Sequence, residues 1–154
     1  MNITILTVLS SVKRHLAALG KRLSKDGKSV FSEITVSSAE EPLLTQYIKT
    51  SAQDIEATLK MFISSATYST TSISMTIENS RGDADFATRV QDMAESYITL
   101  NCVGEYLSMT QPELARKYQD DAQQRIDSLL AYVAHKNATE APLFDYKNVT
   151  ATIS

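Results

Sequence analysis

The feature that most constrains this chain is a helical repeat of apolar residues in segments that glycine and proline rarely interrupt. In the first segment the intervals between apolar residues are alternately four and three positions, through Ile5, Leu9, Val12, Leu16, Leu19 and Leu23. This spacing places the side chains on one face of an α-helix. The 154 residues include only four glycines and three prolines, so the sequence favours long helices.

Four helices are predicted from this repeat, at about residues 4–22, 39–64, 83–109 and 111–136. Because the link before residue 111 is short, the last two helices are expected to be antiparallel neighbours. The apolar positions of the last three helices predict one shared core, which contains Leu44, Ile48, Ile55, Leu59, Val90, Tyr97, Leu114, Tyr118, Ile126 and Leu130.

Two of the helix starts carry capping-box sequences, in which a serine or threonine precedes a glutamate by about three positions. The candidate pairs are Ser37 or Ser38 with Glu40 or Glu41, and Thr110 with Glu113. We therefore expect side-chain caps at the second and fourth helices.

Residues 66–79 depart from the helical repeat, because serines and threonines there alternate with Ile73, Met75 and Ile77. A period of two is typical of a β-strand. The predicted fold is mainly α: a four-helix bundle-like domain over residues 1–137, with a small β-hairpin or extended β-prone insertion. From residue 138 the helical period is lost, and residues 138–154 are predicted to form an extended C-terminal tail.

Charge is unevenly distributed along the chain, whose net charge is −3. Between residues 13 and 28 the only acidic residue is Asp26, and the basic residues are Lys13, Arg14, Lys21, Arg22, Lys25 and Lys28. Two interpretations stay open: a solvated helix end, or a contact surface for DNA or for an acidic face of a neighbouring subunit. The negative total argues against a dedicated DNA-binding domain.

The predicted tail also has two interpretations. It is either a frayed terminus or a segment that docks on a neighbouring chain by strand addition. Its apolar, β-prone residues are the candidates for docking: Leu143, Phe144, Tyr146, Val149 and Ile153.

Candidate catalytic and metal-binding groups are few. The single cysteine, Cys102, lies among apolar residues and is predicted to be a buried, unreactive thiol. Neither His15 nor His135 has a second histidine three or four positions away, and His135 is expected to interact with a helix C-terminus. We predict a protein that is not an enzyme, holds no cofactor or metal, and neither enters a membrane nor carries a secretory signal.

Two segments carry a resemblance to a known class of proteins. The sequence SSAEEPLLTQYIKTSAQDI, at residues 37–55, resembles the start of the head-to-tail connector proteins of tailed bacteriophages, also called adaptor or head-completion proteins. The sequence YLSMTQPELARKY, at residues 106–118, is similar to a helix turn in small proteins from the structural-gene clusters of gut-bacterial phages and prophages.

This resemblance implies a structural virion protein, assembled in the host cytoplasm, without catalytic residues. Identical subunits would form a ring beneath the portal and link the capsid to the tail. The implied partners are copies of the chain itself, the portal protein, and other capsid or tail proteins, with non-specific contact to passing DNA. The alternative is a soluble intracellular helical module that binds other proteins and is unrelated to phages.

Overall fold

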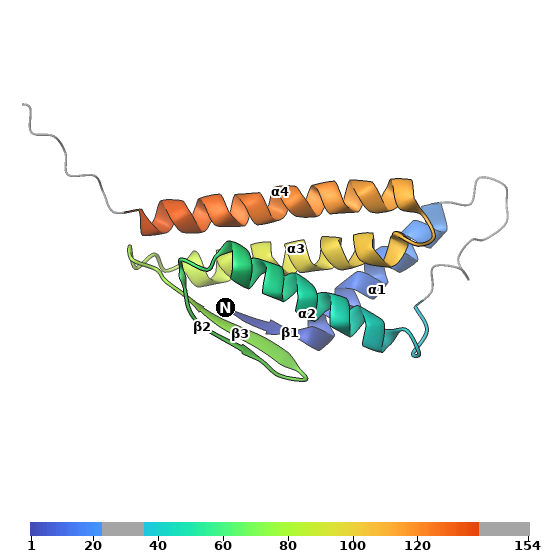
Figure 1. The fold of residues 1–154 in the computed structure, drawn as a ribbon, viewed down its shortest axis with the longest axis horizontal. Coiled ribbons are helices and arrows are strands. Elements are labelled where there is room, and N and C mark those ends of the chain that lie inside the picture. The colour runs from blue at the N-terminus through green and yellow to red at the C-terminus, as the bar shows by residue number, and fades with distance from the viewer. Residues whose placement is uncertain (23–35, 139–154) are drawn as a thin grey trace, which may run out of the picture.

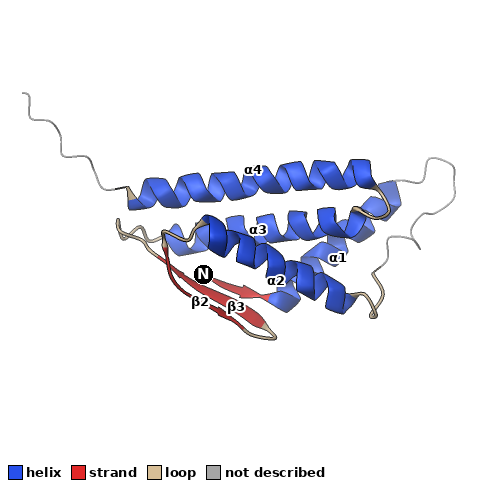
Figure 2. Ribbon diagram, viewed as in Figure 1, coloured by secondary structure: helices blue, strands red, loops and turns tan. Residues whose placement is uncertain are grey.

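The computed structural model describes residues 1–22 and 36–138, which form four helices and a small three-stranded sheet (Figures 1 and 2). The elements, in chain order, are β1 (Asn2–Thr4), α1 (Ile5–Arg22), α2 (Glu41–Thr58), β2 (Ile63–Tyr68), β3 (Ser72–Ile77), α3 (Phe86–Leu107) and α4 (Pro112–Asn137). The prediction of a mainly α fold with a small β insertion is confirmed. The predicted tail lies outside the described residues, apart from Ala138.

Helix α3 is the central element, because α1, α2 and α4 all pack against it (Figure 1). Its apolar residues extend around much of its surface, and the buried ones include Val90, Ile98, Val103 and Leu107. Helix α4 lies alongside α3 in the opposite direction, as predicted, and buries one stripe of residues against it. The helices approach closely at Gly104, where an added Cβ atom would lie 2.9 Å from the Cγ atom of Gln119.

Helix α2 ends at Thr58, although the sequence predicted a helix as far as residue 64. After Thr58 the chain turns, with the Phe62 amide donating to the Leu59 carbonyl at 2.8 Å. The next six residues, ISSATY, form β2 and pair with β3. Because β-branched and aromatic residues such as Ile63, Thr67 and Tyr68 fit a sheet better than a helix, pairing with β3 outweighs continuation of the helix.

Strand β1 was not predicted, because three residues are too few to show a period of two. It pairs with β3, while β2 pairs with the other side of β3, so the antiparallel sheet has the order β1-β3-β2. Ile3 lies opposite Ile73, and both are fully buried. The first helix begins directly after this strand, within one residue of the predicted start.

The two faces of the sheet differ in chemistry. Ile3, Ile73 and Met75 point into the core beneath the helices. The opposite face is largely exposed and consists of polar uncharged side chains, namely those of Asn2, Thr4, Ser65, Thr67, Ser72, Ser74 and Thr76. We call this set the hydroxyl face, since six of its seven members are serine or threonine.

The predicted core is largely confirmed. Seven of the ten residues are buried, and they are Leu44, Ile48, Ile55, Leu59, Val90, Tyr97 and Ile126. Leu114, Tyr118 and Leu130 are only half-buried and pack at the edge of the core. On α4 the fully buried leucine is Leu129, because the stripe that faces α3 passes through it and leaves Leu130 beside the contact.

Neither predicted capping box is complete. For Ser37 and Glu40 only the glutamate half forms, in which the Glu40 carboxylate accepts from the Ser37 amide at 2.8 Å. Helix α2 has Glu40 at its N-cap position and α4 has Gln111, and neither makes a side-chain cap. The Ser37 hydroxyl donates to the Glu40 carboxylate at 2.8 Å instead of accepting from a helix amide. In each helix a proline follows the N-cap closely and removes one of the amides that would need a cap.

Candidate interaction surfaces

One end of the bundle is held together by the carboxylate of Glu40. Its Oε2 atom accepts hydrogen bonds from the amide and the hydroxyl of Ser37, each at 2.8 Å. Its Oε1 atom accepts the Tyr106 hydroxyl at 2.9 Å. Since Tyr106 is near the end of α3, this carboxylate joins the start of α2 to the turn between α3 and α4.

The hydrogen bonds at this joint alter the acidity of both partners. The Ser37 amide and hydroxyl, followed by Tyr106, stabilise the charged carboxylate and lower the pKa of Glu40. Burial, reinforced by the hydrogen bond to Glu40, raises the pKa of Tyr106 to about 12. The joint therefore holds a negative carboxylate and a neutral phenol at neutral pH.

The predicted basic segment begins at the same end. Lys13 forms an ion pair with Glu41, so its positive charge is paired within the molecule. Arg14, the next residue, is exposed. Lys21 and Arg22 belong to the last turn of α1, but their side chains are outside the described set. Lys25, Lys28 and the five docking candidates of the tail also lie outside the described residues.

The opposite end of the bundle is fixed by the last turn of α4. The Asn137 side chain accepts a hydrogen bond from the Ser80 amide and donates one to the Glu78 carbonyl, each at 2.8 Å. Lys136 forms an ion pair with Asp83, just before α3. His135 lies in this last turn, as predicted. The point where the chain leaves α4 is thus attached to the segment that follows β3.

A polar seam runs between α2 and α3. Ser51 is buried. Its hydroxyl donates to the Tyr47 carbonyl at 2.8 Å and accepts from the side-chain amide of Asn101 at 3.0 Å. Cys102 is fully buried next to Ser51, and burial raises the pKa of its thiol to about 12. The predicted burial of Cys102 is confirmed, and its raised pKa is consistent with an unreactive thiol.

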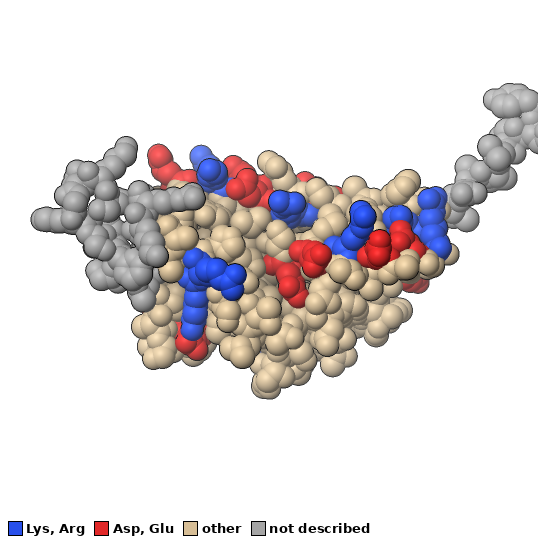
Figure 3. Space-filling model, turned by 180° about the vertical axis from the view of Figure 1, so that it is seen from behind, with Lys and Arg blue, Asp and Glu red and all other residues tan. Residues whose placement is uncertain are grey.

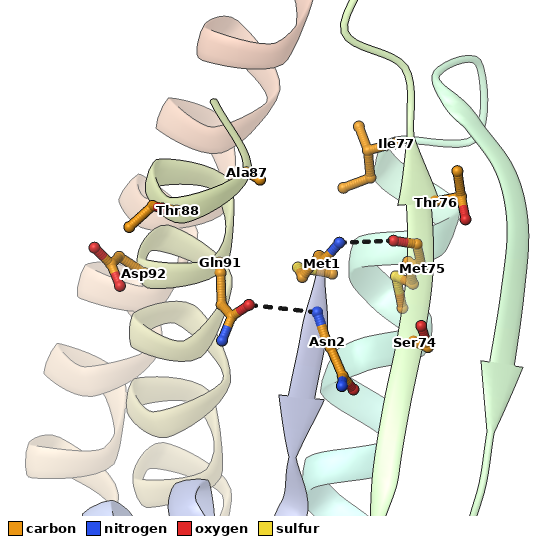
Figure 4. A pocket seen from close by; sticks show the side chains of 10 residues that line it. All are labelled: Met1, Asn2, Ser74, Met75, Thr76, Ile77, Ala87, Thr88, Gln91 and Asp92. Atoms are coloured by element: carbon orange, nitrogen blue, oxygen red, sulfur yellow. Dashed lines mark hydrogen bonds between the residues drawn. The ribbon is translucent and has the colours of Figure 1, made fainter. Parts of the chain in front are cut away.

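A hollow with a volume of about 560 Å³ lies between the sheet and the first turns of α3 (Figure 4). Met1 donates from its terminal ammonium to the Met75 carbonyl at 2.9 Å, and the Asn2 amide donates to Gln91 Oε1 at 3.4 Å. Figure 4 shows β1 between α3 and β3, with β2 on the far side of β3. The outer edge of β1 is therefore next to α3, whereas the outer edge of β2 is not.

Charged side chains of both signs occur along α4, as Figure 3 shows in its upper part, and few lie over the lower part, where α1 and the sheet are. Helix α4 carries four acidic and four basic residues. It therefore has no excess of either sign with which to attract DNA phosphates.

Within residues 1–22 and 36–138, no three or more histidine, cysteine, aspartate or glutamate side chains are grouped so that they could hold a metal ion. No helix in these ranges has the length and hydropathy needed to cross a membrane. No protein-family model matches the chain, and neither does any curated protein or solved structure.

Proposed function

We propose that this chain is a subunit of a head-to-tail connector of a tailed bacteriophage, which assembles as a ring beneath the portal and joins the capsid to the tail. We expect the protein to bind copies of itself, the portal and other virion proteins, without a catalytic group or a cofactor.

The observation that carries the proposal is the hydrogen bond between Glu40 and Tyr106. These residues belong to the two segments, 37–55 and 106–118, that resemble phage structural proteins. The segments are far apart in the sequence, yet they meet at one end of the bundle. A shared contact between both segments supports the interpretation that they form one unit, and not two unrelated helix starts.

The charge pattern of α4 gives additional support. A ring of identical subunits needs a side-to-side contact between two different faces of the same protein. Acidic and basic residues alternate on the exposed side of α4, including Asp120, Arg116 and Arg125. Such a mixed surface is suited to pair with charges of both signs on a neighbouring subunit.

The proposal is tested in cells that carry the gene for this chain and produce tailed particles. Particles are purified and analysed by mass spectrometry and by cryo-electron microscopy. The expected result is a ring of density between portal and tail that accommodates α3 and α4, and filled heads without tails when the gene is deleted.

As a control, the same fractions are analysed from cells that express a Leu6→Ala variant, which changes an exposed apolar side chain on α1. Normal particles are expected from this variant. Recovery of the chain only outside particles, as a monomer bound to a cellular protein, would contradict the proposal and favour the helical binding module.

A further inference from the structure

Strand β2 is an edge strand of the described sheet. It is the last strand in the order β1-β3-β2, and the described residues place no strand on its outer side. Residues 63–77, from β2 through β3, contain no charged residue, no glycine and no proline. Natural edge strands commonly use lysine or proline to prevent pairing with another chain. This hairpin lacks those protective residues.

The hydrogen-bond pattern identifies the backbone groups that face the open edge. The Ser69 amide donates to the Ser72 carbonyl at 2.9 Å, so Ser69 and Ser72 form a hydrogen-bonded pair. Antiparallel pairing alternates along a strand, and Thr67 opposite Ser74 is therefore the next such pair. The amides and carbonyls of Ala66 and Tyr68 consequently point away from β3, toward the free edge.

The end of the chain has the same residue pattern as the strands already in the sheet. Residues 149–154 read VTATIS, in which apolar residues alternate with threonine or serine. Strand β3 reads SISMTI, with its apolar residues on the core side and its hydroxyls on the hydroxyl face. A strand of residues 149–154 beside β2 would continue both faces, with Val149 and Ile153 on the core side.

The position of the last described residues favours a neighbouring subunit as the source of this strand. Asn137 is hydrogen-bonded to Glu78, whose amide donates to the Phe62 carbonyl at the base of the hairpin. A tail that ran from this base along its own β2 would be parallel to it, in a sheet that is otherwise antiparallel. The residues between Ala138 and Val149 span up to about 36 Å when extended, which exceeds the roughly 20 Å length of a six-residue strand, so residues 149–154 can lie beyond their own hairpin.

We propose that residues 149–154 of one subunit add as an antiparallel strand to the free edge of β2 in the next subunit. This inference rests on the proposed ring, because it requires a neighbouring copy. It deepens the proposed function by naming both halves of one contact between subunits. Repeated around a ring, each subunit would give one strand and accept one.

The test uses the full-length chain alone and traps the contact with a disulfide. One preparation carries Thr67→Cys, on the hydroxyl face of β2, and a second carries Thr150→Cys, Thr152→Cys or Ser154→Cys in turn. Facing residues on adjacent strands are close enough for a disulfide. Cys102 is fully buried and stays out of the reaction. Mixing the two preparations under mild oxidation should give a covalent pair of chains for at least one tail position.

Thr4→Cys is the matched control, because Thr4 is exposed on the same face but lies on β1, two strands away from β2. It should give a far smaller yield of linked chains with every tail position. Ala66→Pro is a second test, since it removes an amide that faces the free edge and leaves the ladder to β3 intact. It should strongly reduce the Thr67 cross-link, with the far-UV circular dichroism spectrum unchanged.

Each outcome is decisive for strand addition. Equal yields from Thr67 and Thr4 would overturn it, as would the lack of any linked pair. A chain that carries both Thr67→Cys and Thr152→Cys and closes an internal disulfide at high dilution would also overturn it, in favour of docking within one subunit. A specific cross-link in a chain that is never found in particles would instead overturn the connector function and leave the strand contact standing.

Discussion

At the scale of single residues, Glu40 joins parts of the chain that are distant in sequence. It precedes α2, while Tyr106 lies 66 positions later, near the end of α3. Next to it, Glu41 pairs with Lys13 of α1. Two consecutive glutamates therefore connect the start of α2 with α1 and with α3. Sequence patterns suggested caps for these residues, because a capping box and a tertiary hydrogen bond both use glutamate near a helix start.

Removal of the Tyr106 hydroxyl should weaken this joint. Tyr106→Phe keeps the ring and loses the hydrogen bond to Glu40, so the free energy of unfolding is expected to fall by about 1 kcal/mol. Tyr47→Phe is the matched control, because within the described residues the Tyr47 hydroxyl makes no hydrogen bond. Urea denaturation of the two variants measures the difference, and equal stabilities would show that the Glu40 contact contributes nothing.

The lowered pKa of Glu40 predicts a pH dependence of stability. The folded protein favours the charged carboxylate more than the unfolded chain does, since Ser37 and Tyr106 donate to it. This contribution is complete above the unfolded pKa, near 4.5, and is lost as the pH falls through the lower folded pKa. Glu40→Gln should therefore lower the Tm at pH 7 and have a smaller effect at pH 3. Parallel Tm curves across this range would contradict the assignment.

At the scale of elements, the sequence predicted the helices well and the sheet only in part. The positions of α1, α3 and α4 follow from an apolar repeat that extends over at least 18 residues, and local patterns of that length are hard to mistake. Strand β1 depends on Ile3 meeting Ile73, a contact that no local pattern contains. The end of α2 was misplaced because Leu59 and Phe62 continue its apolar repeat, while pairing with β3 decides the structure of the residues beyond.

The burial of α4 provides a test between two adjacent leucines. Leu129 is fully buried against α3, whereas Leu130 is half-buried. Leu129→Ala should lower the free energy of unfolding by about 2–5 kcal/mol, the usual cost for a buried leucine. Leu130→Ala should cost less than half as much. Thermal and chemical denaturation distinguish the two, and an equal or reversed order would mean that α4 is rotated about its axis relative to this structure.

At the scale of the whole molecule, the two ends of the bundle have different chemistry. One end has the Glu40 joint and the start of the basic segment. The other has the last turn of α4, fixed to the residues after β3, and the point where the tail begins. In the proposed ring the tail would contact the hairpin of a neighbour, while the basic segment would contact an acidic surface.

The candidate sites outside the described residues could be predicted only by composition, because charge and β-propensity identify residue types and not their partners.

The basic segment supplies the last prediction. Reversal of charge at Lys21, Arg22 and Lys25 should weaken incorporation into particles, because the segment would then repel an acidic partner surface. The control reverses Lys49, Lys60 and Arg89, which changes the net charge by the same amount on α2, the following turn and α3, away from the charged side of α4. Incorporation is measured at several salt concentrations during assembly in vitro. The wild-type protein should lose affinity as salt rises and screens the attraction, whereas the first variant should already be weak and respond little. If both variants assemble equally well, the basic segment is a solvated helix end, and the contacts of the ring lie elsewhere.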